Sequence, residues 1–440
     1  MNDNSATYQR LFFVIFWVGV TFGFISDEII PELASMRTLV FLMLDALWVL
    51  LACCTVRNKW HIACMGIFIA VSCATTCLTN GNPFSFWANG LRDFLGIFLA
   101  YPILCYFMQE PSRRERFENA LDKHLMCFLG LQAFCVTYQC LLYGAGDHCG
   151  GSFGNWYSGI VSMCIYCASF YLMHRSIDPS HFFDSLRNNW LPVVLLFPTF
   201  LNETKVSFVL IVLYFVLLMP LDRRYIVRAM WILPVGLLLG WMAIAIYTST
   251  VKDFDDIFSM EFITEYIMID DIEDAEGGAL WDLEEGNKAD VPRLTKIMYL
   301  PILHNEEPGH ELTGWGVGQF KGGSMMDTSE FAERYDWLLM GTIPYMFHVH
   351  IQLGQVGLVM CVLWLLALFV VKPAWSTGRN FNMQLFVLVC ILIIMIYNDS
   401  LRDLWMCMFL FLLMATSWHT RDDEAEEDET DLLPQAQQQQ

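Results

Sequence analysis

Long apolar runs recur along the chain and limit its possible folds more than any other feature. Residues 11–26 and 346–371 are two of about twelve such windows. A helix that crosses a bilayer needs about 20 mostly apolar residues, because it rises about 1.5 Å per residue. The chain is 56% hydrophobic with a mean hydropathy of +0.44. The runs therefore predict an all-α polytopic membrane protein with about 12 transmembrane helices.

The uneven distribution of charge predicts which side of the membrane each loop faces. The formal net charge is −21, and most of it lies in residues 251–343, with 21 acidic and 6 basic residues, and after position 420, with 8 and 1. The predicted membrane part is nearly neutral. Its short loops carry fifteen basic residues on one side and four on the other. Cytoplasmic loops carry the excess of Lys and Arg, so we expect both termini to be cytoplasmic.

These patterns divide the chain into four predicted parts. Residues 1–249 contain transmembrane helices 1–9, residues 250–345 form one large external (periplasmic) loop, and residues 346–418 contain helices 10–12. Residues 419–440 form an acidic cytoplasmic tail that cannot bury an apolar core, so we expect disorder there. Within the loop, residues 292–303 place apolar residues at helical spacing, which predicts a helix.

The same composition argues against several kinds of partner. No basic stripe is present that could displace phosphate counterions, so we expect no nucleic acid partner. Most of the 15 cysteines lie inside apolar runs, where they behave as small hydrophobes. The acidic residues 270–276 lack the spacing of an EF-hand, which favours a solvated acidic face over a calcium site. We therefore expect no metal and no cofactor.

Isolated cations at the predicted outer ends of the spans are candidates for a binding site. They are Arg37, Arg92, Lys205 and Arg402, and the loop adds Arg293. Ionisable groups at membrane depth are costly to desolvate, so they usually face a cavity and pair with an anion. A phosphate on a lipid is one such anion, and a guanidinium can bind it through two parallel hydrogen bonds.

Three of these cations also have a structural interpretation. Arg92 precedes an aspartate, and a local ion pair explains it as well as a ligand does. Arg402 lies between two aspartates, which favours a structural pair. Arg37 lies at a helix start, where its side chain can extend to the membrane interface. Lys205 closes a short turn between two short spans, and this position favours a cavity.

Two histidines open the apolar helix that follows the loop. His348 and His350 are two positions apart, so they point to different faces of a helix and should not bind one metal ion together. A histidine can act as a general base near neutral pH, and the alternative is an interfacial histidine bonded to a backbone carbonyl. Gln352 follows on the same helix. The glycines at 314, 316 and 318 predict a tight turn near the site.

The order of these features resembles the O-antigen polymerase and ligase superfamily of bacterial membrane proteins. Residues 201–207 (LNETKVS) resemble its polar motif with a cation that opens a span, and Arg293 resembles the loop arginine before its glycine turn. Residues 314–320 resemble that turn, and residues 348–357 resemble the helix led by a histidine and closed by GxxG. Two departures are present. The first cation is a lysine, and both histidines lie closer to the glycines, which leaves open which one corresponds.

The resemblance implies a glycosyltransferase of the bacterial inner membrane that is inverting and metal-independent. Such an enzyme polymerises undecaprenyl-pyrophosphate-linked repeat units into an O-antigen, surface polysaccharide or exopolysaccharide. The implied partners are this lipid-linked glycan, a glycan or lipid acceptor, membrane lipids and a chain-length regulator.

Residue roles follow from the same resemblance. Cations would hold the pyrophosphate and stabilise the leaving group, while one histidine would activate the acceptor hydroxyl. The implied catalytic residues are His348, His350 and Arg293. The implied substrate-binding residues are Lys205, Arg92, Arg402 and Gln352.

Two alternatives to a polymerase remain. A ligase of the same superfamily would pass the glycan to lipid A core or another acceptor, and nothing in the residues separates it from a polymerase. A membrane transporter of an anionic substrate would use the same cations. Transporters often contain inverted repeats with paired interrupted helices, and the sequence contains one short hairpin without an evident second copy.

Overall fold

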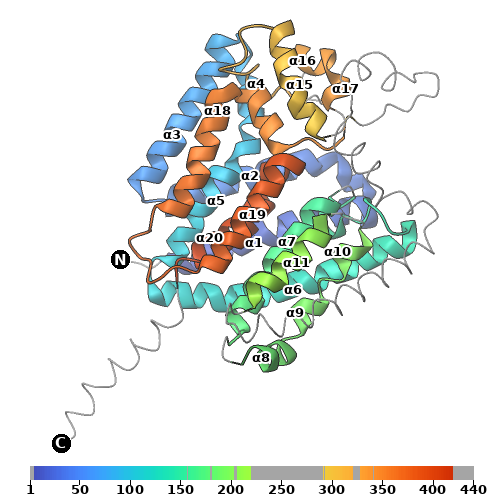
Figure 1. The fold of residues 1–440 in the computed structure, drawn as a ribbon, viewed down its shortest axis with the longest axis vertical. Helices are drawn as coiled ribbons and strands as arrows, with labels where there is room; N and C mark the ends of the chain where they lie inside the picture. Colours follow the sequence, from blue (N-terminus) through green and yellow to red (C-terminus); the bar gives the residue numbers. More distant parts are fainter. Residues whose placement is uncertain are drawn as a thin grey trace, which may run out of the picture.

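The computed structural model describes residues 4–155, 157–178, 181–202, 206–219, 291, 293–320, 328–339 and 341–419. Within these ranges the regular structure is helical and contains no strand (Figure 1). The elements up to residue 218 are α1 (Ser5–Phe24), η1 (Ile25–Ile29), η2 (Pro31–Met36), α2 (Arg37–Thr55), α3 (Lys59–Cys73), η3 (Ala74–Thr79), α4 (Phe84–Gly90), α5 (Arg92–Met108), α6 (Pro111–Tyr143), η4 (Gly151–Phe153), α7 (Ser158–Ser176), α8 (Phe182–Asn188), α9 (Leu191–Val194), α10 (Pro198–Leu201) and α11 (Val206–Leu218). The later elements are α15 (Arg293–Glu306), α16 (Glu330–Arg334), α17 (Asp336–Leu339), α18 (Tyr345–Val370), α19 (Phe381–Tyr397), η6 (Ser400–Arg402) and α20 (Leu404–Thr416).

Five helices in the described ranges are long and apolar enough to cross a membrane, or six if the bent pair α4 and α5 forms one span. They are Ser5–Ile29, Pro31–Thr55, Lys59–Thr79, Pro111–Tyr143 and Tyr345–Val370. Shorter apolar helices include α19 and α20. The all-helical, membrane-compatible fold is thus confirmed for these residues. The predicted ninth span, the acidic part of the loop and the tail after residue 419 lie outside them.

Helix α20 forms the centre of the bundle. Every residue from Leu404 to Thr416 is buried, as expected for a helix that is apolar on all sides. It packs against α5, α7 and α19. Asp403 caps its amino terminus, because the side chain accepts hydrogen bonds from the backbone N–H groups of Trp405 and Met406. This cap fixes the start of α20 at one end of the bundle.

A second, smaller core lies where the loop meets the start of α18. Helices α15, α16 and α17 gather at this end of the molecule (Figure 1), and Leu303, Trp315, Leu338 and Phe347 are among the buried side chains they enclose. The helix predicted for residues 292–303 is confirmed as α15. The loop is therefore partly a folded cap on the membrane bundle.

Two helices are less regular than the sequence pattern predicts. The apolar window at residues 189–201, the first of the two short spans predicted on either side of the Lys205 turn, contains the two four-residue helices α9 and α10 instead of one continuous helix. Helix α18 is interrupted at Gly354, whose backbone has φ 62° and ψ −159°. Prolines explain the first departure, since Pro192 and Pro198 each stand at a helix start and cannot donate a backbone hydrogen bond. Glycine explains the interruption of α18, because a residue without a Cβ can adopt the positive φ found at Gly354.

Candidate functional site

A cleft of about 460 Å³ opens at the end of the bundle that we predicted to face outward. Aromatic side chains, including Phe153, Tyr157 and Trp405, form part of its wall. Its charged side chains come from segments far apart in the sequence, namely α2, α5 and the junction of η6 with α20. They are Arg37, Asp45, Arg92, Asp93, Asp399, Arg402 and Asp403. The cleft thus brings together three of the four cations predicted at outer helix ends.

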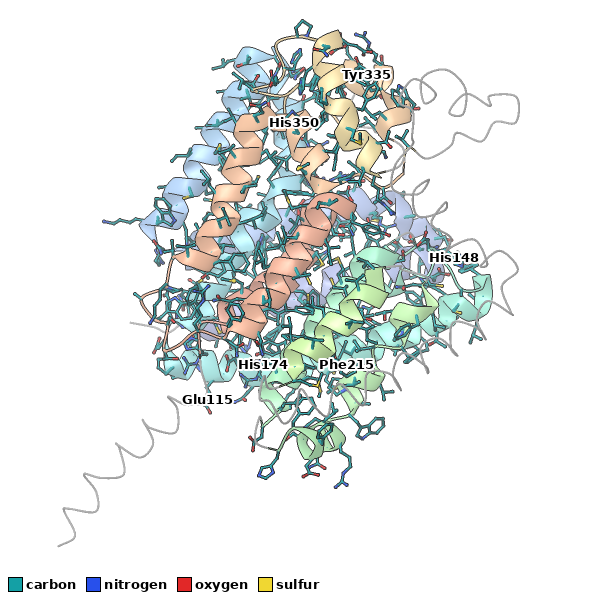
Figure 2. All side chains as sticks on the ribbon, viewed as in Figure 1. Glu115, His148, His174, Phe215, Tyr335 and His350 are labelled. Atoms are coloured by element: carbon teal, nitrogen blue, oxygen red, sulfur yellow. The ribbon has the colours of Figure 1, made fainter. Side chains whose placement is uncertain are left out.

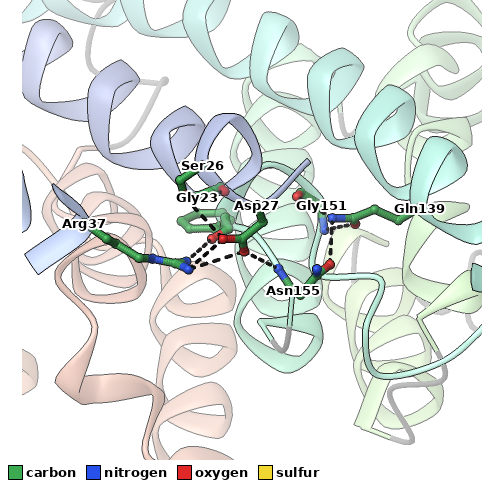
Figure 3. A network of polar contacts seen from close by, with 8 residues as sticks. Gly23, Ser26, Asp27, Arg37, Gln139, Gly151 and Asn155 are labelled. Atoms are coloured by element: carbon green, nitrogen blue, oxygen red, sulfur yellow. Dashed lines mark hydrogen bonds and ion pairs between the residues drawn. The ribbon is translucent and has the colours of Figure 1, made fainter. Parts of the chain in front are cut away.

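Arg37 is held at the edge of the cleft by a polar network (Figure 3). Its Nη1 donates to Asp27 Oδ1 at 3.0 Å, and its Nη2 donates to the carbonyl of Phe153 at 3.1 Å. The backbone N–H of Asn155 donates to the other oxygen of Asp27 at 3.0 Å. These bonds join η1, α2, η4 and the segment before α7, so Arg37 has a structural role as well as a place in the cleft wall.

Arg92 makes its ion pair across two helices. Its Nε lies 2.5 Å from Asp45 Oδ2, and the two residues belong to α5 and α2. The sequence had suggested the adjacent Asp93 as the partner. Neighbouring residues on a helix point in different directions, and this explains why the distant aspartate forms the pair.

Arg402 connects the cleft to the interior. Its Nη1 lies 2.5 Å from Asp399 Oδ2, and its Nη2 lies 3.6 Å from Asp93 Oδ2. The ion pair with Asp399 agrees with the structural interpretation of Arg402. Since Asp93 is 7% exposed, this second contact places a nearly buried carboxylate directly behind the arginine.

The cleft therefore contains three arginines and four aspartates, so it is not a simple cationic pocket. A guanidinium carries five N–H donors. Arg92 donates only through Nε to any partner in the described part of the chain. Its other N–H groups have no hydrogen-bond partner among the described residues, and ion pairs with Asp45 and Asp399 hold the guanidinium groups of Arg92 and Arg402 in fixed positions.

His348 lies behind the cleft and does not line it. Its side chain is fully buried, with Nε2 2.5 Å from Gln352 Nε2 and 3.7 Å from Asp93 Oδ2. Gln352 Oε1 accepts a hydrogen bond from the backbone N–H of Gly318 at 2.8 Å. The amide nitrogen of Gln352 must therefore donate to His348. The Nε2 lone pair of His348 is engaged inside the protein.

His350 faces the loop cap on another side of α18, at the end of the molecule that carries α15 and α16 (Figure 2). Its Nε2 lies 2.8 Å from His304 Nε2, so one ring donates and the other accepts. Partial burial lowers the pKa of His304, and the neighbouring His310 lowers it further, while Glu311 opposes the shift. The two predicted histidines thus point to different surroundings.

The glycine turn supports α18 at its interruption. Gly314, Gly316 and Gly318 all have positive φ, at 66°, 99° and 99°. The N–H groups of Trp315 and Gly316 donate to carbonyls of α18 at 2.8 and 3.1 Å. A Cβ on Gly314 would come within 2.6 Å of backbone atoms of α18. The turn expected here is present, and it supplies donors to helix carbonyls next to the break.

Arg293, the cation that the loop was predicted to add, does not line the cleft. Arg293 stacks on the ring of Tyr397, with its guanidinium carbon 3.9 Å from the ring centroid, and reaches Thr342 Oγ1 at 3.4 Å. Lys296 is fully buried, and its Nζ donates to the carbonyl of Thr342 at 3.1 Å. Lys205 lies outside the described residues.

The aspartates of the cleft were missed in the sequence. Asp45 stands alone among apolar residues in the middle of α2, and an ionisable residue within a span marks a functional site by default. That signal was available for Asp45. Asp93 gave no such signal, because it sits beside an arginine at a helix start.

Comparison with known proteins adds no family to this description. No protein-family model matches the chain, and no curated protein is significantly similar to it. Within the described ranges, no group of three or more His, Cys, Asp or Glu side chains is placed to hold a metal ion. The residues of the cleft therefore have to be interpreted from their own chemistry.

Proposed function

We propose that the protein is a membrane glycosyltransferase that takes a glycan from a lipid-linked diphosphate and passes it to an acceptor hydroxyl. In this proposal it polymerises undecaprenyl-pyrophosphate-linked repeat units at the outer face of a bacterial inner membrane. About twelve spans, an external loop between the ninth and tenth, and cytoplasmic termini belong to the same proposal.

The observation that carries this proposal is the convergence of Arg37, Arg92 and Arg402 on one cleft. They come from segments separated by as much as 365 positions in the sequence, so local structure alone does not explain their meeting. Arginine is the side chain best suited to a diphosphate, because its planar fork makes bidentate contacts. Fixed cations around a departing diphosphate stabilise the charge that develops on it.

The aspartates of the cleft are compatible with this role. An arginine without a counter-charge at membrane depth would be costly to desolvate in the absence of ligand. The pairs Arg92–Asp45 and Arg402–Asp399 reduce that cost and orient the guanidinium groups. A diphosphate would then bind to donors that already point into the cleft.

Alanine variants of Arg92 and Arg402 test the proposal in cells that depend on the protein. We expect long-chain glycan to disappear in both, while the amount of folded protein in the membrane stays the same. Normal glycan in both variants would contradict the proposal.

Product analysis in a deletion strain separates the two acceptor classes. Retention of a single repeat on core lipid indicates a polymerase, and loss of every chain length indicates a ligase.

A transporter of an anionic substrate is the second candidate, favoured by the interruption of α18 at Gly354. Broken helices often form the substrate site of transporters. Here, however, the N–H groups of Gln355 and Val356 just past the break donate to carbonyls of the loop cap at 3.0 and 3.1 Å. Purified protein in liposomes distinguishes the two. Uptake of undecaprenyl-free anionic oligosaccharide without a transfer product would favour transport.

A further inference from the structure

The proposed transfer needs a proton acceptor within hydrogen-bond reach of the attacking hydroxyl. Neither His348 nor His350 lines the cleft. His348 is fully buried with Nε2 engaged by Gln352, and His350 faces His304. The acceptor must therefore be sought among the carboxylates that do line the cleft.

Three of these four carboxylates hold an arginine. Asp45 pairs with Arg92, Asp399 pairs with Arg402, and Asp93 lies 3.6 Å from Arg402 as well. These three side chains are better suited to orienting the arginines than to accepting a proton.

Asp403 differs from the other three. Its Oδ1 accepts hydrogen bonds from the N–H groups of Trp405 at 2.8 Å and Met406 at 3.3 Å. Among the described residues, its Oδ2 has no hydrogen-bond partner, and no Arg, Lys or His lies within ion-pair distance of the side chain. The helix cap fixes one oxygen, so the other is presented to the cleft in a defined direction.

We propose that Asp403 is the general base that accepts the proton of the attacking hydroxyl, an assignment that rests on the proposed function. The acceptor O–H proton moves to Asp403 Oδ2 as the acceptor oxygen bonds to the anomeric carbon of the donor. The bond from that carbon to the diphosphate oxygen breaks, and the diphosphate leaves with the electron pair. Attack from the side opposite the leaving group inverts the anomeric centre. Arg92 and Arg402 bind the departing charge.

The ionisation of Asp403 depends on the charged and titratable groups around it. Neighbouring acids favour its protonated form and arginines favour its ionised form. The groups that share the cleft with it are Arg37 and Asp45 from α2, Arg92 and Asp93 from α5, Tyr157 before α7, and Asp399 and Arg402 at η6. On its interior side, the thiols of Cys164 from α7 and Cys407 from α20 interact with its charge.

Asp403→Asn tests the assignment, because asparagine caps a helix as well as aspartate does but cannot accept the proton. Purified full-length protein in liposomes is given lipid extract from deletion cells, which accumulate the donor, and product length is measured. We expect transfer to fall about 10²- to 10⁴-fold, the usual contribution of a general base. Binding of undecaprenyl diphosphate and the melting temperature should stay at wild-type values. Asp184→Asn, in the first turn of α8 and outside the cleft wall, is the control and should transfer normally.

The pH profile of the wild type gives an independent measurement that does not require the variant to fold. The rate should fall by about tenfold per pH unit on the acid side, because only the ionised carboxylate accepts a proton.

Normal transfer by Asp403→Asn, or parallel loss of its transfer and its binding of undecaprenyl diphosphate, would overturn the assignment and leave the proposed function intact. A wild type that neither binds undecaprenyl diphosphate nor forms product would overturn the proposed function itself.

Discussion

The cleft and the loop cap both contain polar side chains at the same end of the molecule, yet they are built differently. In the cleft, Arg92 and Arg402 are about one quarter exposed, and unused donors remain on Arg92. Where the loop cap meets the start of α18, Gln352 and His348 are fully buried, and the amide nitrogen of Gln352 donates to the His348 ring. Buried polar groups must be satisfied within the protein to avoid a desolvation penalty. The cleft is therefore suited to binding a ligand, and the cap is suited to support.

The largest effect is expected from a change in the cleft. Arg92→Ala should reduce glycan transfer about 10²- to 10³-fold, as does the loss of one donor to a developing anion. The rate is measured with purified protein in liposomes. Arg92→Lys should recover part of the rate, because it restores the charge without the planar fork. Arg57→Ala, an exposed arginine that donates to the carbonyl of Cys54 at 3.3 Å and does not line the cleft, is the matched control. Equal rates in both alanine variants would place the chemistry elsewhere.

A change at the contact between α18 and the loop cap should act on stability instead. Gly354→Ala introduces a Cβ at φ 62°, within 2.4 Å of the backbone carbonyl carbon of Leu312. Strained backbone of this kind costs about 1 to 3 kcal/mol before any clash, so we expect a clear fall in melting temperature in detergent.

Gly130→Ala is the control for this substitution. Gly130 lies within α6, and a Cβ there meets nothing within 4 Å. Alanine favours a helix over glycine by up to about 1 kcal/mol. Equal melting temperatures for the two variants would show that the interruption of α18 is not a rigid feature.

His348→Ala tests whether the His348 side chain stabilises the fold or takes part in catalysis. Loss of the ring leaves the amide of Gln352 without its partner, which costs about 1 to 3 kcal/mol of stability. We expect the folded fraction to keep the wild-type dependence of transfer on pH. If the rate of glycan transfer fell about 10²-fold or more while the melting temperature stayed the same, His348 would instead be favoured as the general base.

The smallest effect concerns pH and the cap. Partial burial lowers the pKa of His304, so the unfolded chain binds its proton more readily than the folded chain does. Stability should therefore fall as the pH drops through the ordinary histidine range. We expect a lower melting temperature at pH 5.5 than at pH 7.5, and a smaller difference in His304→Gln. An identical pH response in the variant would assign the change to other groups.

Three of the cations that the sequence singled out do line the cleft. Isolated cations at predicted helix ends indicated Arg37, Arg92 and Arg402, because ionisable groups in apolar surroundings are rare and costly. The spacing of two residues between His348 and His350 correctly predicted different faces of a helix. Local periodicity is enough for such inferences, because one helix turn determines which side chains share a face.

Other parts depended on contacts between distant segments. The pairing of Arg92 with Asp45 spans 47 positions, and the bond from Arg37 to Phe153 spans 116. The break at Gly354 needs the loop cap to bond the helix carbonyls on one side and the N–H groups on the other. A single sequence contains no local signal for these arrangements.

By itself, the sequence determined that the described chain is helical and suited to a membrane, since apolar runs of sufficient length leave the backbone no other way to satisfy its hydrogen bonds in lipid. It also determined α15, through the helical spacing of its apolar residues, and the glycine turn, through the glycines at 314, 316 and 318. Only the tertiary structure decided which carboxylate meets each arginine and which polar side chains reach a common cleft. Those choices depend on how the helices pack against one another, and packing is a property of the whole bundle.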